Sequence, residues 1–264
     1  DLAHWHDMTS VGNGIVLVTG PTGSGKTTTL YSTLRQLAQP EVNVCTIEDP
    51  IEMVEGAFNQ MQVNHSIELD FSAGVRALMR QDPDIIMVGE IRDLETANMA
   101  TQAALTGHLV LSTLHTNDSP GSISRLLELG VPAYLVKATV RGIMSQRLVR
   151  ILCASCKTFE EVDIDAWQQL TQPWDKPPPE RIARPVGCRE CRETGYIGRQ
   201  GIYEVLVNSE AVQQLIRPNL DTAKIREAAM GQGMQTLRLS GATRVARGET
   251  TIEEVMRVAP PLDT

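Results

Sequence analysis

The chain has 264 residues, of which 42% are hydrophobic and 21% charged, proportions of an ordinary globular protein with one or two domains. Its longest apolar runs are about five residues, well short of the roughly 20 that a membrane-spanning helix requires. The net charge of −8 and the aromatic content of 4% do not suit a broad nucleic-acid-binding surface, which is usually basic and rich in stacking aromatics. We therefore expect no nucleic acid among the partners.

The chain in order predicts an α/β fold with a parallel sheet. The first 13 residues show no clear periodicity, and we expect them to be a linker from a preceding region of a longer protein. From Gly14 on, apolar runs alternate with segments of helical spacing, which is typical of a parallel sheet covered on both faces. Strands are predicted at 15–19, 42–48, 84–89 and 108–114, and helices at 26–38, 71–80, 93–106 and 119–129.

A phosphate-binding loop follows the first predicted strand. Residues 20–27 match the Walker A pattern G-x-x-x-x-G-K-[ST] and open the helix at 26–38. Glycines allow the backbone N–H groups to turn toward an anion, and the helix adds its positive N-terminal end. We expect Lys26 to reach the β and γ phosphates and Thr27 to bind magnesium. The predicted nucleoside triphosphate site consists of Gly20, Pro21, Thr22, Gly23, Ser24, Gly25, Lys26, Thr27 and Thr28.

The other predicted strands also end in polar groups that suit phosphate chemistry. The second strand ends at Glu48-Asp49, the third at Gly89-Glu90 and the fourth at His115. In open α/β sheets, ligands bind beyond the carboxyl ends of the strands. We therefore expect these groups to converge on the nucleotide.

The four apolar residues 85–88 are followed by Gly89 and Glu90, a pattern similar to the second nucleotide-binding motif of phosphate-loop enzymes. The acid of that motif holds magnesium or polarises water. Gly89 stands where many relatives have a second acid, and Glu48 is the obvious carboxylate to share the task. The alternative for each is a solvated carboxylate at a strand end. We interpret His115 as a contact to the γ phosphate, whereas for His108 a structural role is as good an interpretation.

Three arginines near the second acidic motif are weaker candidates. Arg76, Arg80 and Arg92 are of the type that neutralises transition-state charge, often from a neighbouring subunit. The alternative is that they are simply solvated.

Four of the five cysteines form two C-x-x-C pairs. Cys153, Cys156, Cys188 and Cys191 can supply four thiolates to a tetrahedral, structural zinc ion, and residues 157–187 separate the pairs. Buried thiols or a redox pair are the alternatives. Beyond them, a strand around 202–207 and several short helices are predicted, the last of them starting at a capping Thr251.

These motifs together resemble the secretion ATPases of type II secretion and type IV pilus assembly. The resemblance rests on residues 20–31, 46–52, 82–93 and 106–116, which correspond to the phosphate loop, aspartate box, second nucleotide-binding motif and histidine box of that family. It implies a RecA-like core that binds ATP and works as a homohexamer at the cytoplasmic face of the bacterial inner membrane. It also implies that Glu48 activates water and Glu90 is associated with magnesium, roles that could be exchanged.

The resemblance also implies the function and the domain organisation. The four-cysteine module is typical of export and assembly ATPases and not of retraction ATPases. We expect an ATP-hydrolysing motor that acts on an inner-membrane platform and cytoplasmic secretion or pilus-assembly proteins. The alternatives are a DNA-translocating or conjugation ATPase and a nucleotide-gated scaffold. The expected parts are a linker at 1–13, an ATPase core at 14–150, a metal-binding subdomain at 151–200 and a helical subdomain at 201–264.

Overall fold

The structure is a computed structural model that describes residues 2–259 and 261, and it divides into two compact units. The first unit comprises residues 2–22, 26–145 and 205–234, and the second comprises residues 23–25, 146–204 and those from 235 on. Within the described part of the chain, no helix has both the length and the apolar character needed to cross a membrane.

A mainly parallel sheet organises the first unit. In the described part of the chain it has seven strands in the order β3-β2-β4-β5-β1-β6-β9, and β6 and β9 continue into the second unit. Strands β1 to β5 pair in parallel with their neighbours, and β6 pairs in parallel with β1. The expected α/β class is confirmed. The strands are β1 (Gly14–Thr19), β2 (Val44–Glu48), β3 (Asn59–Gln62), β4 (Ile85–Val88), β5 (Leu109–Leu114), β6 (Val140–Leu152) and β9 (Tyr196–Val207).

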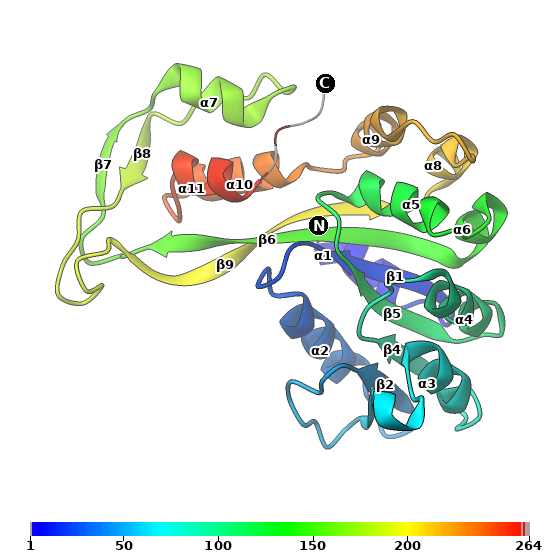
Figure 1. The fold of residues 1–264 in the computed structure, drawn as a ribbon. Helices are drawn as coiled ribbons and strands as arrows, with labels where there is room; N and C mark the ends of the chain where they lie inside the picture. The colour runs from blue at the N-terminus through cyan, green and yellow to red at the C-terminus, as the bar shows by residue number, and fades with distance from the viewer. Residues whose placement is uncertain (1, 260, 262–264) are drawn as a thin grey trace. The chain divides into compact units, whose positions relative to one another are not determined.

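Helices cover both faces of the sheet in the first unit. Figure 1 shows α2 on one face and α3 and α4 on the other. The chain moves from β1 across to β2 and then returns through β4 to β5, so right-handed crossovers place the two sets of helices on opposite faces. The helices of this unit are α1 (Leu2–Thr9), α2 (Lys26–Leu37), η1 (His65–Ile67), α3 (Phe71–Leu78), α4 (Leu94–Leu105), α5 (Ser119–Glu128), α6 (Ala133–Thr139), α8 (Glu210–Leu215) and α9 (Thr222–Gly231).

The predicted strands and helices before residue 130 occur with ends that differ by at most two residues. Local signals fix them: the Asp93 side chain accepts a hydrogen bond from Thr96 N at 2.8 Å and begins α4, and Gly107 ends it with a φ of 108°. Part of the segment expected to be a linker is helical, because residues 2–9 form α1. Its Trp5 is buried and donates a hydrogen bond to Thr33 Oγ1 at 3.0 Å, which holds α1 on the first unit.

Two strands carry too much polarity to be recognised from hydrophobic periodicity. Strand β3 is an edge strand, and none of its residues is fully buried. Strand β6 contains three arginines. Its Arg141 donates hydrogen bonds to Asn13 O at 3.0 Å and Asn13 Oδ1 at 2.8 Å, so a charged side chain is accommodated within the strand.

The second unit has its own hydrophobic core. Strands β7 (Thr158–Glu161) and β8 (Arg181–Arg184) form an antiparallel pair, and α7 (Ile164–Thr171) connects them. Trp167 and Leu170 of α7 pack in one buried cluster with residues of α10 (Leu237–Ala246) and α11 (Ile252–Val258). The predicted helical tail is therefore divided, since α8 and α9 belong to the first unit and α10 and α11 to the second.

Candidate nucleotide site and four-cysteine cluster

The loop between β1 and α2 has the backbone of a phosphate-binding loop. Gly20, Gly23 and Gly25 have φ values of 149°, 78° and 87°, which residues with a Cβ atom rarely adopt. The Lys26 ammonium group donates hydrogen bonds to Gly20 O at 2.8 Å and Pro21 O at 3.1 Å, so it lies folded over the loop.

Ser24 adds an observation that favours an anion in this loop. Its hydroxyl group is buried and has no hydrogen-bond partner in the described part of the chain. An unpartnered buried hydroxyl is costly, and a phosphate oxygen is the type of acceptor that would satisfy it. The Ser24 carbonyl is held by Gln146 Nε2 at 2.7 Å, and a Cβ atom at position 25 would lie 2.7 Å from the same nitrogen.

Glu48 ends β2 as a buried carboxylate that accepts three hydrogen bonds. Its side chain is held by Thr46 Oγ1 at 2.6 Å, by the Tyr31 hydroxyl at 2.7 Å and by Gln60 Nε2 at 3.2 Å. Burial and the adjacent Glu48 carboxylate raise the pKa of Tyr31 above its ordinary value of 10, so this hydroxyl stays protonated and acts as a donor.

Glu90 follows β4 and lies in a second polar group at the same edge of the sheet. Its carboxylate forms an ion pair with Arg92 and lies 3.3 Å from His115 Nε2. A Cβ atom at Gly89 would lie 3.3 Å from Ile47 O and 3.5 Å from the Glu48 Cα atom. The glycine thus lets the segments that carry the two acids approach closely, which a second acid at this position would oppose.

The segment after β5 is fixed by a hydroxyl network and a half-buried ion pair. The Thr19 hydroxyl lies 2.7 Å from the Thr116 hydroxyl, which lies 2.5 Å from that of Ser122. Asp118 begins α5 and receives a hydrogen bond at 2.6 Å from Arg226, a buried residue of α9. Both ends of the segment that carries His115 are therefore anchored in the first unit.

Three other candidate residues lie away from this edge. Arg76 is in the last turn of α3 and contacts Met99 Sδ at 4.0 Å, and Arg80 follows α3 on the way to the start of β4. The start of β4 lies at the amino ends of the parallel strands, whereas Glu48 and Glu90 lie at their carboxyl ends. The two arginines are therefore at the opposite end of the strands from these acids. His108 precedes β5, and its Nδ1 lies 2.8 Å from Ala103 O, which favours the structural interpretation of this histidine.

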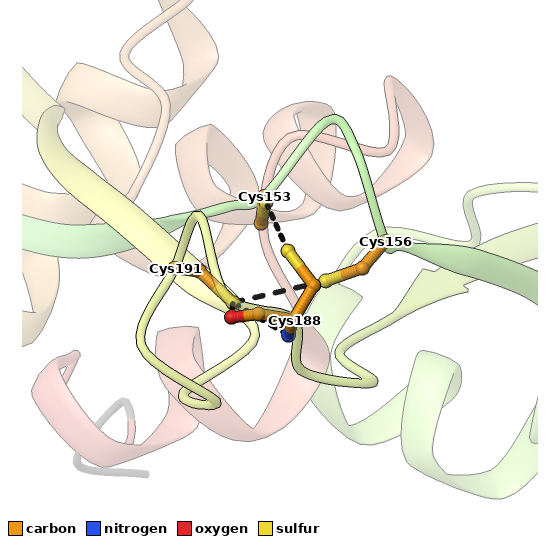
Figure 2. A group of neighbouring side chains, drawn as sticks. All are labelled: Cys153, Cys156, Cys188 and Cys191. Carbon is orange, nitrogen blue, oxygen red and sulfur yellow. Dashed lines mark hydrogen bonds between the residues drawn. The ribbon is translucent and has the colours of Figure 1, made fainter.

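The four cysteines of the two C-x-x-C pairs come together in the second unit (Figure 2). All four sulfur atoms lie within 4.8 Å of one another, with Cys153 and Cys188 3.9 Å apart and Cys156 and Cys191 also 3.9 Å apart. Tetrahedral coordination with Zn–S bonds of about 2.3 Å requires sulfur atoms about 3.8 Å apart. The cluster therefore fits zinc, and with four sulfur ligands no position is left for a substrate.

Backbone N–H groups donate hydrogen bonds to two of these sulfur atoms. Gly187 N donates to Cys156 Sγ at 3.3 Å, while Cys188 N and Gly195 N donate to Cys191 Sγ at 3.1 and 3.2 Å. Burial raises the pKa of Cys191, but the last two N–H groups together with the Cys188 and Cys156 thiols outweigh it and lower the pKa to about 6. The Gly187 N–H group lowers the pKa of Cys156, but burial and the other three thiols outweigh it and raise the pKa to about 11. The long segment between the pairs is the β7-α7-β8 insertion, which explains the distance between the pairs in the sequence.

Three residues of this site were not predicted from the residues themselves. Tyr31 and Gln60 hold Glu48, and Arg226 holds Asp118. The only sequence signal was a tyrosine in the second turn of a helix, next to the buried Leu30 and Leu34. Gln60 lies in a polar edge strand, and Arg226 is distant from Asp118 in the sequence.

A parallel α/β sheet with a phosphate loop after its central strand and acids at neighbouring strand ends is the architecture of phosphate-loop nucleoside triphosphatases. The chain belongs to the family of type II/IV secretion system proteins, whose model matches residues 2–257. The match confirms the resemblance to the secretion ATPases that the sequence motifs indicated.

Individual relatives include pilus-assembly and secretion proteins. The chain is 58% identical to the type IV pilus assembly ATPase TfpB of Acinetobacter baylyi, over 98% of this chain and 44% of that protein. It is 45% identical to the type II secretion system ATPase E of Vibrio cholerae, over 97% of this chain and 51% of that protein. The chain thus spans about half the length of these curated relatives.

A solved structure of a pilus retraction motor has the same fold. The crystal structure of PilT with bound ADP matches 99% of this chain and 65% of its own, with a TM-score of 0.72 and 31% sequence identity. The ATPase DotB of Legionella pneumophila matches 97% of this chain and 62% of its own, with a TM-score of 0.71 and 27% identity.

Proposed function

We propose that this chain is the ATP-hydrolysing part of a motor that drives type IV pilus assembly, with type II secretion as the second candidate. The observation that carries the proposal is the combination of a phosphate loop with the four-cysteine cluster in a chain of the secretion family. Pilus assembly is placed first because three relatives with that name are 58%, 49% and 47% identical, whereas those named for type II secretion are 45% to 46% identical.

The nucleotide would be held by the phosphate loop. Lys26 lies over the loop with its ammonium group on two carbonyl oxygens, from which it can turn to the β and γ phosphates of ATP. Hydroxyl and carboxylate oxygens are suitable donors for magnesium, so Thr27 with Glu90 would hold it. The ion would neutralise charge that develops on the phosphates.

Hydrolysis requires a group that accepts a proton from the attacking water. We assign this role to Glu48, because it is buried and oriented by three donors, whereas the two oxygens of Glu90 already face Arg92 and His115. His115, at the end of β5 and against Glu90, would contact the γ phosphate. Arg92 would contribute positive charge at the same edge.

Arg76 and Arg80 lie at the opposite edge of the sheet and cannot complete this chain's own site. We propose that any role they have is toward a neighbouring subunit of a homohexamer, the assembly that the family resemblance implies. The motor would act at the cytoplasmic face of the inner membrane on a platform protein. A zinc ion on the four cysteines would have a structural role.

The experiment compares Glu48→Gln with the wild type in the full-length protein, in the bacterium that produces it. We expect the variant to bind ATP but to lose turnover, surface pili and twitching together, while secretion of exoenzymes continues. Loss of exoenzyme secretion with normal pili would indicate the second candidate. Normal pili and secretion without turnover would contradict the motor and support a nucleotide-gated scaffold, and stimulation of turnover by DNA would indicate a translocase.

A further inference from the structure

A closed hydrogen-bond network connects Glu48 to the helix of the phosphate loop and to the loop after β2. Tyr31 lies in the second turn of α2, directly after the phosphate loop, and its side chain is 1% exposed. Its hydroxyl donates to Glu48 Oε2 at 2.7 Å and lies 3.0 Å from Met53 O. Gln60 Nε2 lies 2.9 Å from the Tyr31 hydroxyl, 3.2 Å from Glu48 Oε1 and 2.9 Å from Met53 O.

The network leaves Glu48 one free acceptor position. Each carboxylate oxygen has two lone pairs. Those of Oε1 are taken by Thr46 and Gln60, and one of those on Oε2 is taken by Tyr31. The remaining lone pair of Oε2 is the position at which a water molecule can donate a proton, so the three donors decide which atom of Glu48 is available as a base.

Two of the three donors to Glu48 have a second acceptor, the Met53 carbonyl. A tyrosine hydroxyl has a single proton, but that of Tyr31 has two acceptors within reach, Glu48 Oε2 and Met53 O. If Glu48 turns away, the proton can be donated to the Met53 carbonyl, and Gln60 Nε2 can do the same. Of the three donors to Glu48, Tyr31 and Gln60 then keep an acceptor, and only the buried Thr46 hydroxyl loses the bond that it makes to Glu48.

We propose that Tyr31 and Gln60 are positioning residues for Glu48, and that they couple its orientation to the phosphate loop through α2 and to residues 49–57 through the Met53 carbonyl. The inference rests on the proposed function in one respect, the role of Glu48 as the base. It adds that the same carboxylate is aimed by a side chain from the helix that begins at Lys26.

Tyr31→Phe tests this with the least disturbance, because it removes one oxygen and keeps the ring that packs edge-on against Phe58 at 5.6 Å. The matched control is Tyr134→Phe, which removes the same atom from a tyrosine that is 68% exposed on α6. We expect Tyr31→Phe to lower kcat about tenfold, the loss of one charge-assisted hydrogen bond, with KM for ATP within twofold of the wild type. The control should match the wild type.

Two further measurements separate positioning from a general structural effect. In a Glu48→Gln background, Tyr31→Phe should change the residual turnover less than twofold, because the group through which it acts is already gone. Hydrogen exchange of the amides at 51–57 should become faster in Tyr31→Phe and in Gln60→Met, since both variants lose bonds to the Met53 carbonyl.

Each outcome decides the proposal. A kcat of Tyr31→Phe within twofold of the wild type, a loss confined to KM, or an equal loss in the Glu48→Gln background would overturn the positioning role. If the wild-type chain itself does not hydrolyse ATP, the proposed function fails separately. In that case the exchange measurement decides, and unchanged exchange at 51–57 in Tyr31→Phe would overturn the network as a constraint on this loop.

Discussion

Glu254 of α11 provides the most direct test of how the second unit is held together. Its buried carboxylate accepts hydrogen bonds from Arg150 Nη2 at 2.5 Å and from Arg257 Nη2 at 2.8 Å, as well as from Arg150 N at 3.2 Å. Burial raises the pKa of Glu254, but these donors outweigh it and lower the pKa from 4.5 to about 2. Glu254→Gln removes the charge that both arginines share.

The magnitude follows from the pKa. At 1.36 kcal/mol per pKa unit, the lowering from 4.5 to about 2 corresponds to about 3 kcal/mol of stability. The side chain of Glu254 is only 3% exposed, but those of Arg150 and Arg257 are 44% and 60% exposed, so water screens part of the attraction. We therefore expect Glu254→Gln to lower the free energy of unfolding by about 2 kcal/mol at pH 7.

The assay is urea-induced unfolding of the wild type and Glu254→Gln between pH 7 and pH 2. Because the pKa is lowered on folding, the contribution is present in full above about pH 4.5 and is lost as the pH falls toward 2. The difference between the two proteins should shrink over that interval. Glu253→Gln, an exposed acid one position earlier in the same helix, is the matched control and should behave like the wild type. A difference below about 0.5 kcal/mol, the usual effect of a surface substitution, would refute the reasoning.

Two further predictions concern the metal cluster and the half-buried ion pair of Asp118 with Arg226. Metal analysis should give zinc on the four cysteines, and Cys153→Ser should release it and lower the thermal midpoint by about 10 °C, because a structural zinc contributes directly to folding. Arg226→Met should lower the free energy of unfolding by about 3 kcal/mol in urea titrations, because it leaves the Asp118 carboxylate without its guanidinium partner.

Each of these two predictions has an internal control. For the cluster, Cys45→Ser changes a buried cysteine outside it and should leave the zinc content unchanged, whereas a zinc-free wild type with titratable thiols would contradict the assignment. For the ion pair, adding Asp118→Asn to Arg226→Met should recover part of the lost stability. A double variant as unstable as the sum of both single variants would show that the two side chains do not interact.

The sequence was sufficient where local rules and hydrophobic periodicity determine the structure. The strands that precede Lys26, Asp49, Glu90 and His115 are short, mainly apolar and buried on both faces, so their positions in the sequence could be predicted. The cysteine spacing predicted a cluster that the structure contains.

Long-range polar contacts could not be predicted in this way. Strand β3 has no apolar pattern, yet it delivers Gln60 to Glu48, because its place at the sheet edge is fixed by pairing with β2 and not by its own hydrophobicity. Residues 2–9 are too few for a clear helical period, and their helix depends on the contact between Trp5 and Thr33. The ion pair of Asp118 with Arg226 joins elements more than a hundred residues apart in the sequence.

The most direct test of the central claim, that the residues of this chain carry out ATP hydrolysis, is the rate of ATP turnover per chain at increasing protein concentration, with magnesium present and zinc retained. We expect magnesium-dependent turnover that rises with protein concentration as subunits assemble. This turnover should be lost in Lys26→Ala. A folded, zinc-loaded chain that binds ATP but shows no turnover at any concentration would contradict the claim.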